Sequence, residues 1–103
     1  MTYEELQARY GSYLAEMVRQ VLTLEEFQKL EVETVLPYLE LRTERMFQEY
    51  RQCTSAPSDK AQAREDYALI LERRWHEADD LTQQVAAAEK QAREADYIAA
   101  VGA

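Results

Sequence analysis

The sequence contains few of the residues that make turns. Glycine and proline occur twice each in 103 residues, and asparagine does not occur at all. These residues supply the backbone conformations of tight turns, so their scarcity excludes turn-rich all-β and α/β folds. Glu, Gln, Ala, Leu and Arg, which favour helices, dominate the chain instead. The composition therefore predicts an all-α fold.

Disulfide and membrane signals are also scarce. Cys53 is the single cysteine, so it cannot form an internal disulfide, which fits a reducing compartment. The first residues lack the basic start and apolar run of a signal peptide. No segment approaches the roughly 20 apolar residues of a membrane span. We expect a cytoplasmic protein without a membrane partner.

Basic residues are fewer than acidic residues. Twenty acidic residues against twelve basic ones give a formal net charge of −8. Phosphate binding needs a positive face, so nucleic acid is not an expected partner. The acidity is typical of a soluble surface. A sharper alternative is an acidic surface that meets a basic partner or imitates DNA phosphates.

Two capping boxes predict where helices begin. Thr2 followed by Glu5 starts a helix over residues 3–21, and Thr23 followed by Glu26 starts a second one. Apolar residues recur every three or four positions through the first helix, the period of one helix face. Gly11 lies inside this run, where we expect it to be tolerated at a cost of about 1 kcal/mol relative to Ala; the alternative is that it marks a close helix contact.

The second helical arm is predicted over residues 24–53, with a bend near Pro37. Proline removes a hydrogen bond inside a helix but not in its first turn, so two interpretations stay open. Either the helix continues with a kink, or Thr34 caps a new helix that has Pro37 in its first turn. The apolar spacing keeps its period on both sides of the proline.

Residues 54–59 form the one clear loop, and a helix is predicted over residues 59–100. Ser58 is the preferred N-cap, and Ser55 is the alternative. The helix would be about 60 Å long at 1.5 Å per residue, which points toward a coiled coil. Residues 79–82 are its weakest part, where a break is an open alternative. Gly102 is a plausible C-terminal stop.

Two long arms joined by a short loop must run antiparallel. We therefore predict one domain, residues 1–103: a coiled-coil-like antiparallel hairpin with the N-terminal helix packed on it, making a three- to four-helix bundle. The last ten or so residues of the final helix extend past the hairpin. Their apolar side chains need cover from the first helix, a second copy or another protein. These residues are Ala92, Ala95, Tyr97, Ile98 and Val101.

No residue pattern predicts catalysis. His76 shares a helix face with Glu72 and Asp80, which could form a metal site, but a di-iron bundle needs Glu-x-x-His on two helices and position 73 is Arg. No nucleophile lies at a recognisable spacing from a base, and no Gly-rich loop exists to bind phosphate. We expect neither an enzyme nor a bound metal or cofactor.

The remaining cluster with binding character is Arg74 beside Trp75, because Arg and Trp are frequent at interface hot spots. Trp75 also lies on the apolar side of the helix, where a packing role is the favoured interpretation and Arg74 would flank it at the edge. The favoured hypothesis is a non-enzymatic protein–protein interaction module: a helical adaptor, assembly factor, small chaperone or inhibitor. It would dock an apolar helix face on a partner and use acidic residues at the rim. The alternatives are an acidic inhibitor of a nucleic-acid-binding protein and a metal-binding bundle centred on His76. A homodimer is open in each case.

Overall fold

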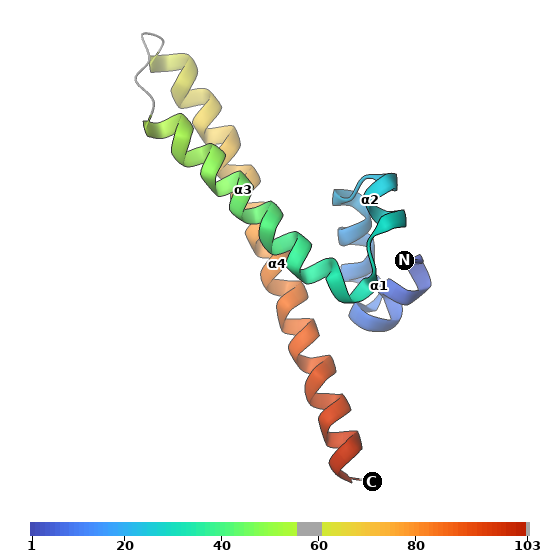
Figure 1. Cartoon of the computed structure of the whole chain (residues 1–103). Coiled ribbons are helices and arrows are strands. Elements are labelled where there is room, and N and C mark those ends of the chain that lie inside the picture. The colour runs from blue at the N-terminus through green and yellow to red at the C-terminus, as the bar shows by residue number, and fades with distance from the viewer. Residues whose placement is uncertain (56–60, 103) are drawn as a thin grey trace. The chain divides into compact units, whose positions relative to one another are not determined.

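The computed structural model describes residues 1–55 and 61–102, which are all-α, with no strand in these ranges (Figure 1). The described residues cluster into two compact units, Met1–Leu36 with Gln83–Ala103, and Pro37–Thr82. The elements in chain order are α1 (Tyr3–Val21), α2 (Leu24–Lys29), the 3₁₀ helix η1 (Val32–Thr34), α3 (Val35–Ser55) and α4 (Ala61–Gly102).

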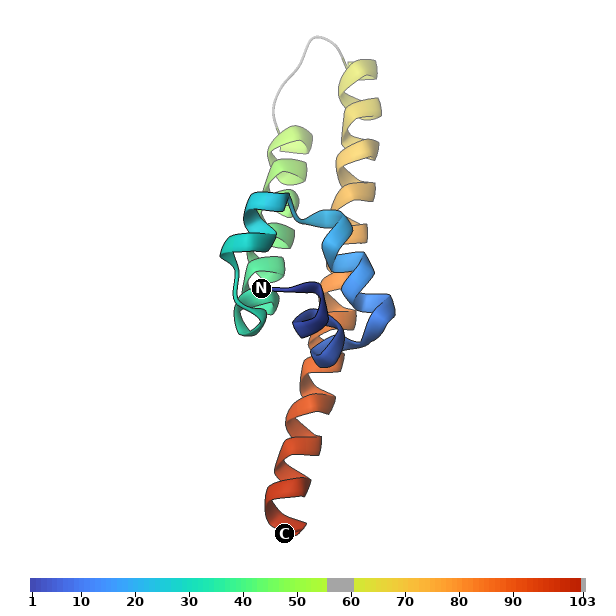
Figure 2. The same cartoon turned by 90° about the vertical axis from the view of Figure 1, so that its right-hand side faces the viewer.

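Helix α1 has the predicted bounds, and its capping box is confirmed. The Thr2 hydroxyl accepts from the Glu5 amide at 3.2 Å, and the Glu5 carboxylate accepts from the Thr2 amide at 3.1 Å. The expectation that Gly11 is tolerated inside a regular helix is wrong. Gly11 has φ 85° and ψ 167°, a region that is almost exclusive to glycine, and α1 is kinked there (Figure 2).

The second capping box is also present, but it begins a helix of only six residues. The Thr23 hydroxyl accepts from the Glu26 amide at 3.1 Å, and α2 ends at Lys29. Leu30 and Glu31 are extended, with ψ of 144° and 151°. The predicted continuous arm over residues 24–53 is therefore wrong.

The chain turns before Pro37, not at it. Thr34 stabilises the turn, since its hydroxyl accepts from the Glu31 amide at 3.2 Å and donates to the Glu31 carbonyl at 2.8 Å. Helix α3 then begins at Val35, so Pro37 lies in its first turn, where an amide hydrogen is not needed. The position of Pro37 agrees with the second of the two interpretations, but the Thr34 hydroxyl bonds to Glu31 and not to an amide of α3.

In the unit Pro37–Thr82, α3 and α4 pack antiparallel, as Figures 1 and 2 both show for the green and the yellow-to-orange helices. Leu39, Leu71, Ala78 and Leu81 are buried between them. Helix α4 continues through residues 79–82 without a break. The preferred N-cap, Ser58, lies outside the described residues, and the alternative, Ser55, is the last residue of α3.

A pair of buried threonines lies within this apolar contact. The hydroxyls of Thr43 and Thr82 are 2.9 Å apart, and the Thr82 hydroxyl also lies 2.8 Å from the Ala78 carbonyl. Thr43 and Thr82 are only 9% and 8% exposed. A polar pair in an apolar helix contact favours one alignment of the two helices, because other alignments separate the two hydroxyls and leave that of Thr43 without its Thr82 partner.

The other unit packs α1 against the second part of α4, as predicted for the N-terminal helix. The Met1 amine donates to the Leu30 carbonyl at 2.8 Å, which ties the start of α1 to the end of α2. Burial of apolar side chains from each element supplies the main driving force. The buried apolar residues of this unit are Leu6, Tyr10, Ala15, Val18, Leu22, Val32, Val35 and Val85.

No helix in the described ranges has an apolar stretch long enough to cross a membrane. The expectation of a single domain stays a prediction.

Replacing Gly11 with alanine should destabilise the fold by about 1–3 kcal/mol, because the backbone at this position is unfavourable for residues with a Cβ. Gly102→Ala is the matched control, since neither glycine has a neighbour within 4 Å of an added Cβ and only Gly11 has positive φ. Urea unfolding followed by circular dichroism measures both variants. Equal stability of the two would contradict the analysis of the kink.

Thr82→Val should lower the free energy of unfolding by about 1–2 kcal/mol, because it leaves the buried Thr43 hydroxyl without its partner. The double variant Thr43→Val/Thr82→Val should lose less than the sum of the two single variants, since both hydroxyls are then gone. Urea unfolding of all four proteins gives the coupling. Strict additivity would show that the two hydroxyls do not interact.

Candidate functional site

A buried carboxylate determines how α1 lies on α4. Glu89 on α4 is only 5% exposed. The Arg9 guanidinium forms a two-pronged ion pair with it, with Nε donating to Oε2 at 2.8 Å and Nη2 to Oε1. The Tyr10 hydroxyl donates to the same Oε2 at 2.9 Å. A buried charge is tolerated only when it is paired and hydrogen-bonded, and Glu89 meets both conditions.

These contacts shift the protonation equilibria of all three residues. The hydrogen bonds from Arg9, and secondarily from Tyr10, hold the pKa of Glu89 below its ordinary value of 4.5 even though burial acts in the opposite direction. Burial first, and the hydrogen bond to Glu89 second, raise the pKa of Tyr10 to about 12. The pKa of Arg9 is raised mainly by its hydrogen bond to Glu89. The site therefore holds Glu89 ionised, Arg9 charged and Tyr10 neutral around neutral pH.

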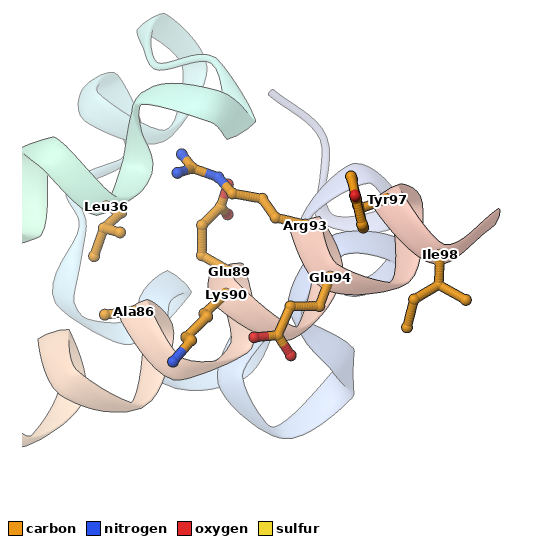
Figure 3. Close-up of a pocket in the computed structure, with 8 residues that line it drawn as sticks. All are labelled: Leu36, Ala86, Glu89, Lys90, Arg93, Glu94, Tyr97 and Ile98. Atoms are coloured by element: carbon orange, nitrogen blue, oxygen red, sulfur yellow. The ribbon is translucent and has the colours of Figure 1, made fainter. Parts of the chain in front are cut away.

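A groove lies beside this ion pair, between the first turn of α3 and the last turns of α4 (Figure 3). Its volume is about 460 Å³. Leu36 comes from α3, and the other lining residues come from α4, so one helix provides most of the surface. The lining residues are Leu36, Ala86, Glu89, Lys90, Arg93, Glu94, Tyr97 and Ile98.

The groove has apolar ends and a charged middle. Leu36 and Ala86 line one end, and Tyr97 and Ile98 line the other. Between them Lys90 and Glu94 are exposed. Arg93 lies with its Nε 3.5 Å from Glu89 Oε1, although 77% of its side chain remains exposed. The rim therefore carries charges of both signs, not the acidic rim expected from the sequence.

The predicted contact residues near the end of α4 differ in exposure. Tyr97, Ile98 and Val101 are 70%, 68% and 67% exposed, so α1 does not cover them. Ala95 is exposed as well. Ala92 is half-buried and lines a separate hollow of about 390 Å³ together with residues of α1 that include Arg9.

The predicted pair Arg74 and Trp75 belongs to the other compact unit and does not line the groove. Trp75 is half-buried against α3, with its ring centroid 4.8 Å from that of Phe47 and 6.1 Å from that of Tyr50. Trp75 therefore contributes to packing between α3 and α4. Arg74 is exposed beside it.

The residues weighed for metal binding do not form a ligand set. His76 Nε2 lies 3.7 Å from Glu72 Oε1, and both side chains are about half exposed. Across the part of the chain that the structure describes, no three His, Cys, Asp or Glu side chains come together to hold a metal ion. The metal-binding alternative has no structural support in these residues.

Sequence reasoning missed the burial of Glu89 and its bond to Tyr10, and it missed further residues of the site: Arg9, Leu36, Ala86, Lys90, Arg93 and Glu94. A signal for Glu89 was present, because it lies four residues after Val85 and seven after Thr82, on the buried row of α4. An acidic residue on such a row requires a partner. The predicted contact residues on this helix began at Ala92 and did not include Glu89.

Comparison with known proteins finds no match to a family model, a curated protein or a solved structure. The functional argument therefore depends on the residues of the groove.

Glu89→Gln should lower the free energy of unfolding by about 1.5–3 kcal/mol at neutral pH, because it removes the charge that Arg9 and Tyr10 share. Glu94→Gln, an exposed change on the same helix, should cost under about 0.5 kcal/mol. Chemical denaturation of both variants makes the comparison.

The same denaturation curves across pH test the protonation states. The pKa of Glu89 is lowered by folding, so its stabilisation is complete above pH 4.5 and is lost as pH falls through the folded pKa. Wild type and Glu89→Gln should therefore converge in stability in acid. The pKa of Tyr10 is raised by folding from 10.0 to about 12, so its contribution is lost across that alkaline interval. A stability difference that is constant with pH would contradict the assignment.

Proposed function

We propose that this chain is a non-enzymatic protein–protein interaction module that binds a partner through the groove at the end of α4. The observation that carries the proposal is the exposure of Tyr97, Ile98 and Val101 beside that groove, at 67–70% each. Single exposed apolar residues are ordinary, but a group on one helix next to a groove is typical of an interaction site.

The shape of the groove supports a macromolecular partner over a small molecule. Its lining residues run from Ala86 to Ile98 on α4, which is about three helical turns. Small-molecule sites usually enclose most of the ligand surface, whereas this groove runs along the exposed side of a helix. An extended apolar groove with charged side chains along it suits a helix of a partner.

The charges of the groove favour specific docking. Lys90, Arg93 and Glu94 supply both signs within about one helical turn. Charged side chains around an apolar contact chiefly determine orientation and partner choice. The two basic residues give no support to an inhibitor that imitates DNA phosphates at this site. We therefore retain the interaction module as the proposed function, with an adaptor, assembly factor, chaperone or inhibitor as its specific roles.

Ile98→Asp should abolish partner binding while leaving the fold intact, because Ile98 is exposed at the end of the groove. Leu69→Asp is the matched control, since Leu69 is 64% exposed on the same helix and does not line the groove. Crosslinking in the native host, followed by affinity purification and quantitative mass spectrometry, compares wild type and both variants, so that weakly bound partners, including further copies of this chain, are also captured. We expect some proteins to be captured by wild type and by Leu69→Asp but not by Ile98→Asp. If all three capture the same proteins, the proposal is overturned.

A further inference from the structure

We infer that the groove binds the same groove of a second copy of this chain, with the two α4 helices crossing antiparallel midway between Lys90 and Glu94. This inference rests on the proposed function, because it names the partner of that site. It is carried by the order of side chains along α4.

One row of side chains on α4 has apolar residues at its two ends and opposite charges in its middle. Ala86, Lys90, Glu94 and Ile98 follow one another at steps of four residues, and all four line the groove. Residues at this spacing form one ridge on a helix surface. Figure 3 shows Lys90 and Glu94 on the same side of α4, one turn apart. The row therefore reads apolar, positive, negative, apolar.

A two-fold axis midway along this row superimposes complementary groups. Lys90 of one copy meets Glu94 of the other, and the reverse pair forms by symmetry. Ile98 of each copy meets Ala86 of the other, beside Leu36 at that end of the groove. A two-fold interface requires such self-complementarity, because every contact between the copies occurs twice. Interdigitated rows of this spacing are the commonest form of helix packing.

An ion pair within the fold also reduces the charge repulsion between the two copies at the contact. Glu89 lies next to the row, but Arg9 neutralises it within the fold. The charges on the row itself are one Lys and one Glu, which cancel, and Arg93, beside the row and 77% exposed, adds one positive charge to the groove. The net charge of −8 opposes association at long range. At 0.15 M ionic strength the Debye length is about 8 Å, so this repulsion is screened while contacting pairs persist.

The interface is small, because it consists of one helix crossing per copy. Interfaces at the lower end of the size range are weak and transient. We therefore expect a monomer–dimer equilibrium with Kd on the order of 10–100 µM, a range that sedimentation equilibrium resolves.

Charge reversal at the two central residues tests the contact. Lys90→Glu should place two Glu–Glu contacts in the dimer, and Glu94→Lys two Lys–Lys contacts, so each variant should raise Kd by roughly ten-fold or more. An equimolar mixture of the two variants restores two opposite-charge pairs. The mixture should form a heterodimer with Kd close to wild type, measured by sedimentation at 0.15 M salt on the full chain.

Lys29→Glu is the control for net charge, because Lys29 is exposed on α2, does not line the groove, and undergoes the same change. Its Kd should stay within about three-fold of wild type. A wild-type chain that is monomeric up to 1 mM, or a dimer that both reversals leave intact, would overturn the inference. The Ile98→Asp purification decides the proposed function separately, because it detects any partner that uses the groove.

Discussion

The packing of α1 on α4 depends on the ion pair between Arg9 and the buried Glu89. Apolar packing between α1 and α4 is non-directional and tolerates small rotations of one helix about the other. A buried carboxylate is more restrictive, because moving Arg9 or Tyr10 away would leave it without partners. Glu89 therefore determines which side of α4 is covered by α1.

The side of α4 that α1 covers also determines which side of α4 stays exposed. Glu89 lies one residue before Lys90, so once α1 occupies the Glu89 side, the row containing Lys90 and Glu94 remains exposed. The chain reversal at Leu30 and Glu31 then brings Leu36 to the edge of this row. The groove is thus a consequence of three local features: a paired buried charge, a break before α3 and a long helix that continues to Gly102.

The sequence predicted the helices well where capping chemistry and apolar period agree. Thr2 and Thr23 mark the starts of α1 and α2 because a hydroxyl and a carboxylate three residues apart satisfy free amides locally. Prediction from the sequence failed where the backbone conformation depends on tertiary structure. The apolar spacing continues through Leu30 although the chain is extended there, and nothing local shows that Gly11 adopts positive φ.

The candidate site was only partly predictable for a similar reason. Tyr97, Ile98 and Val101 could be found because they lie beyond the expected hairpin arm. Leu36, which comes from α3, could not be assigned to the same groove without knowing where the chain reverses. Trp75 was a binding candidate by residue type and a packing residue by its place on the apolar side of the helix, and its contacts with Phe47 and Tyr50 on α3 confirm the packing role.

A double-mutant cycle across Arg9 and Glu89 tests the central claim most directly. Arg9→Met, Glu89→Gln and the combined variant, compared with wild type by chemical denaturation at neutral pH, give the coupling free energy between the two side chains. A coupling of about 1.5–3 kcal/mol is predicted for a buried charged pair. A value under about 0.5 kcal/mol would show that α1 is held on α4 by apolar packing alone, and would contradict the account.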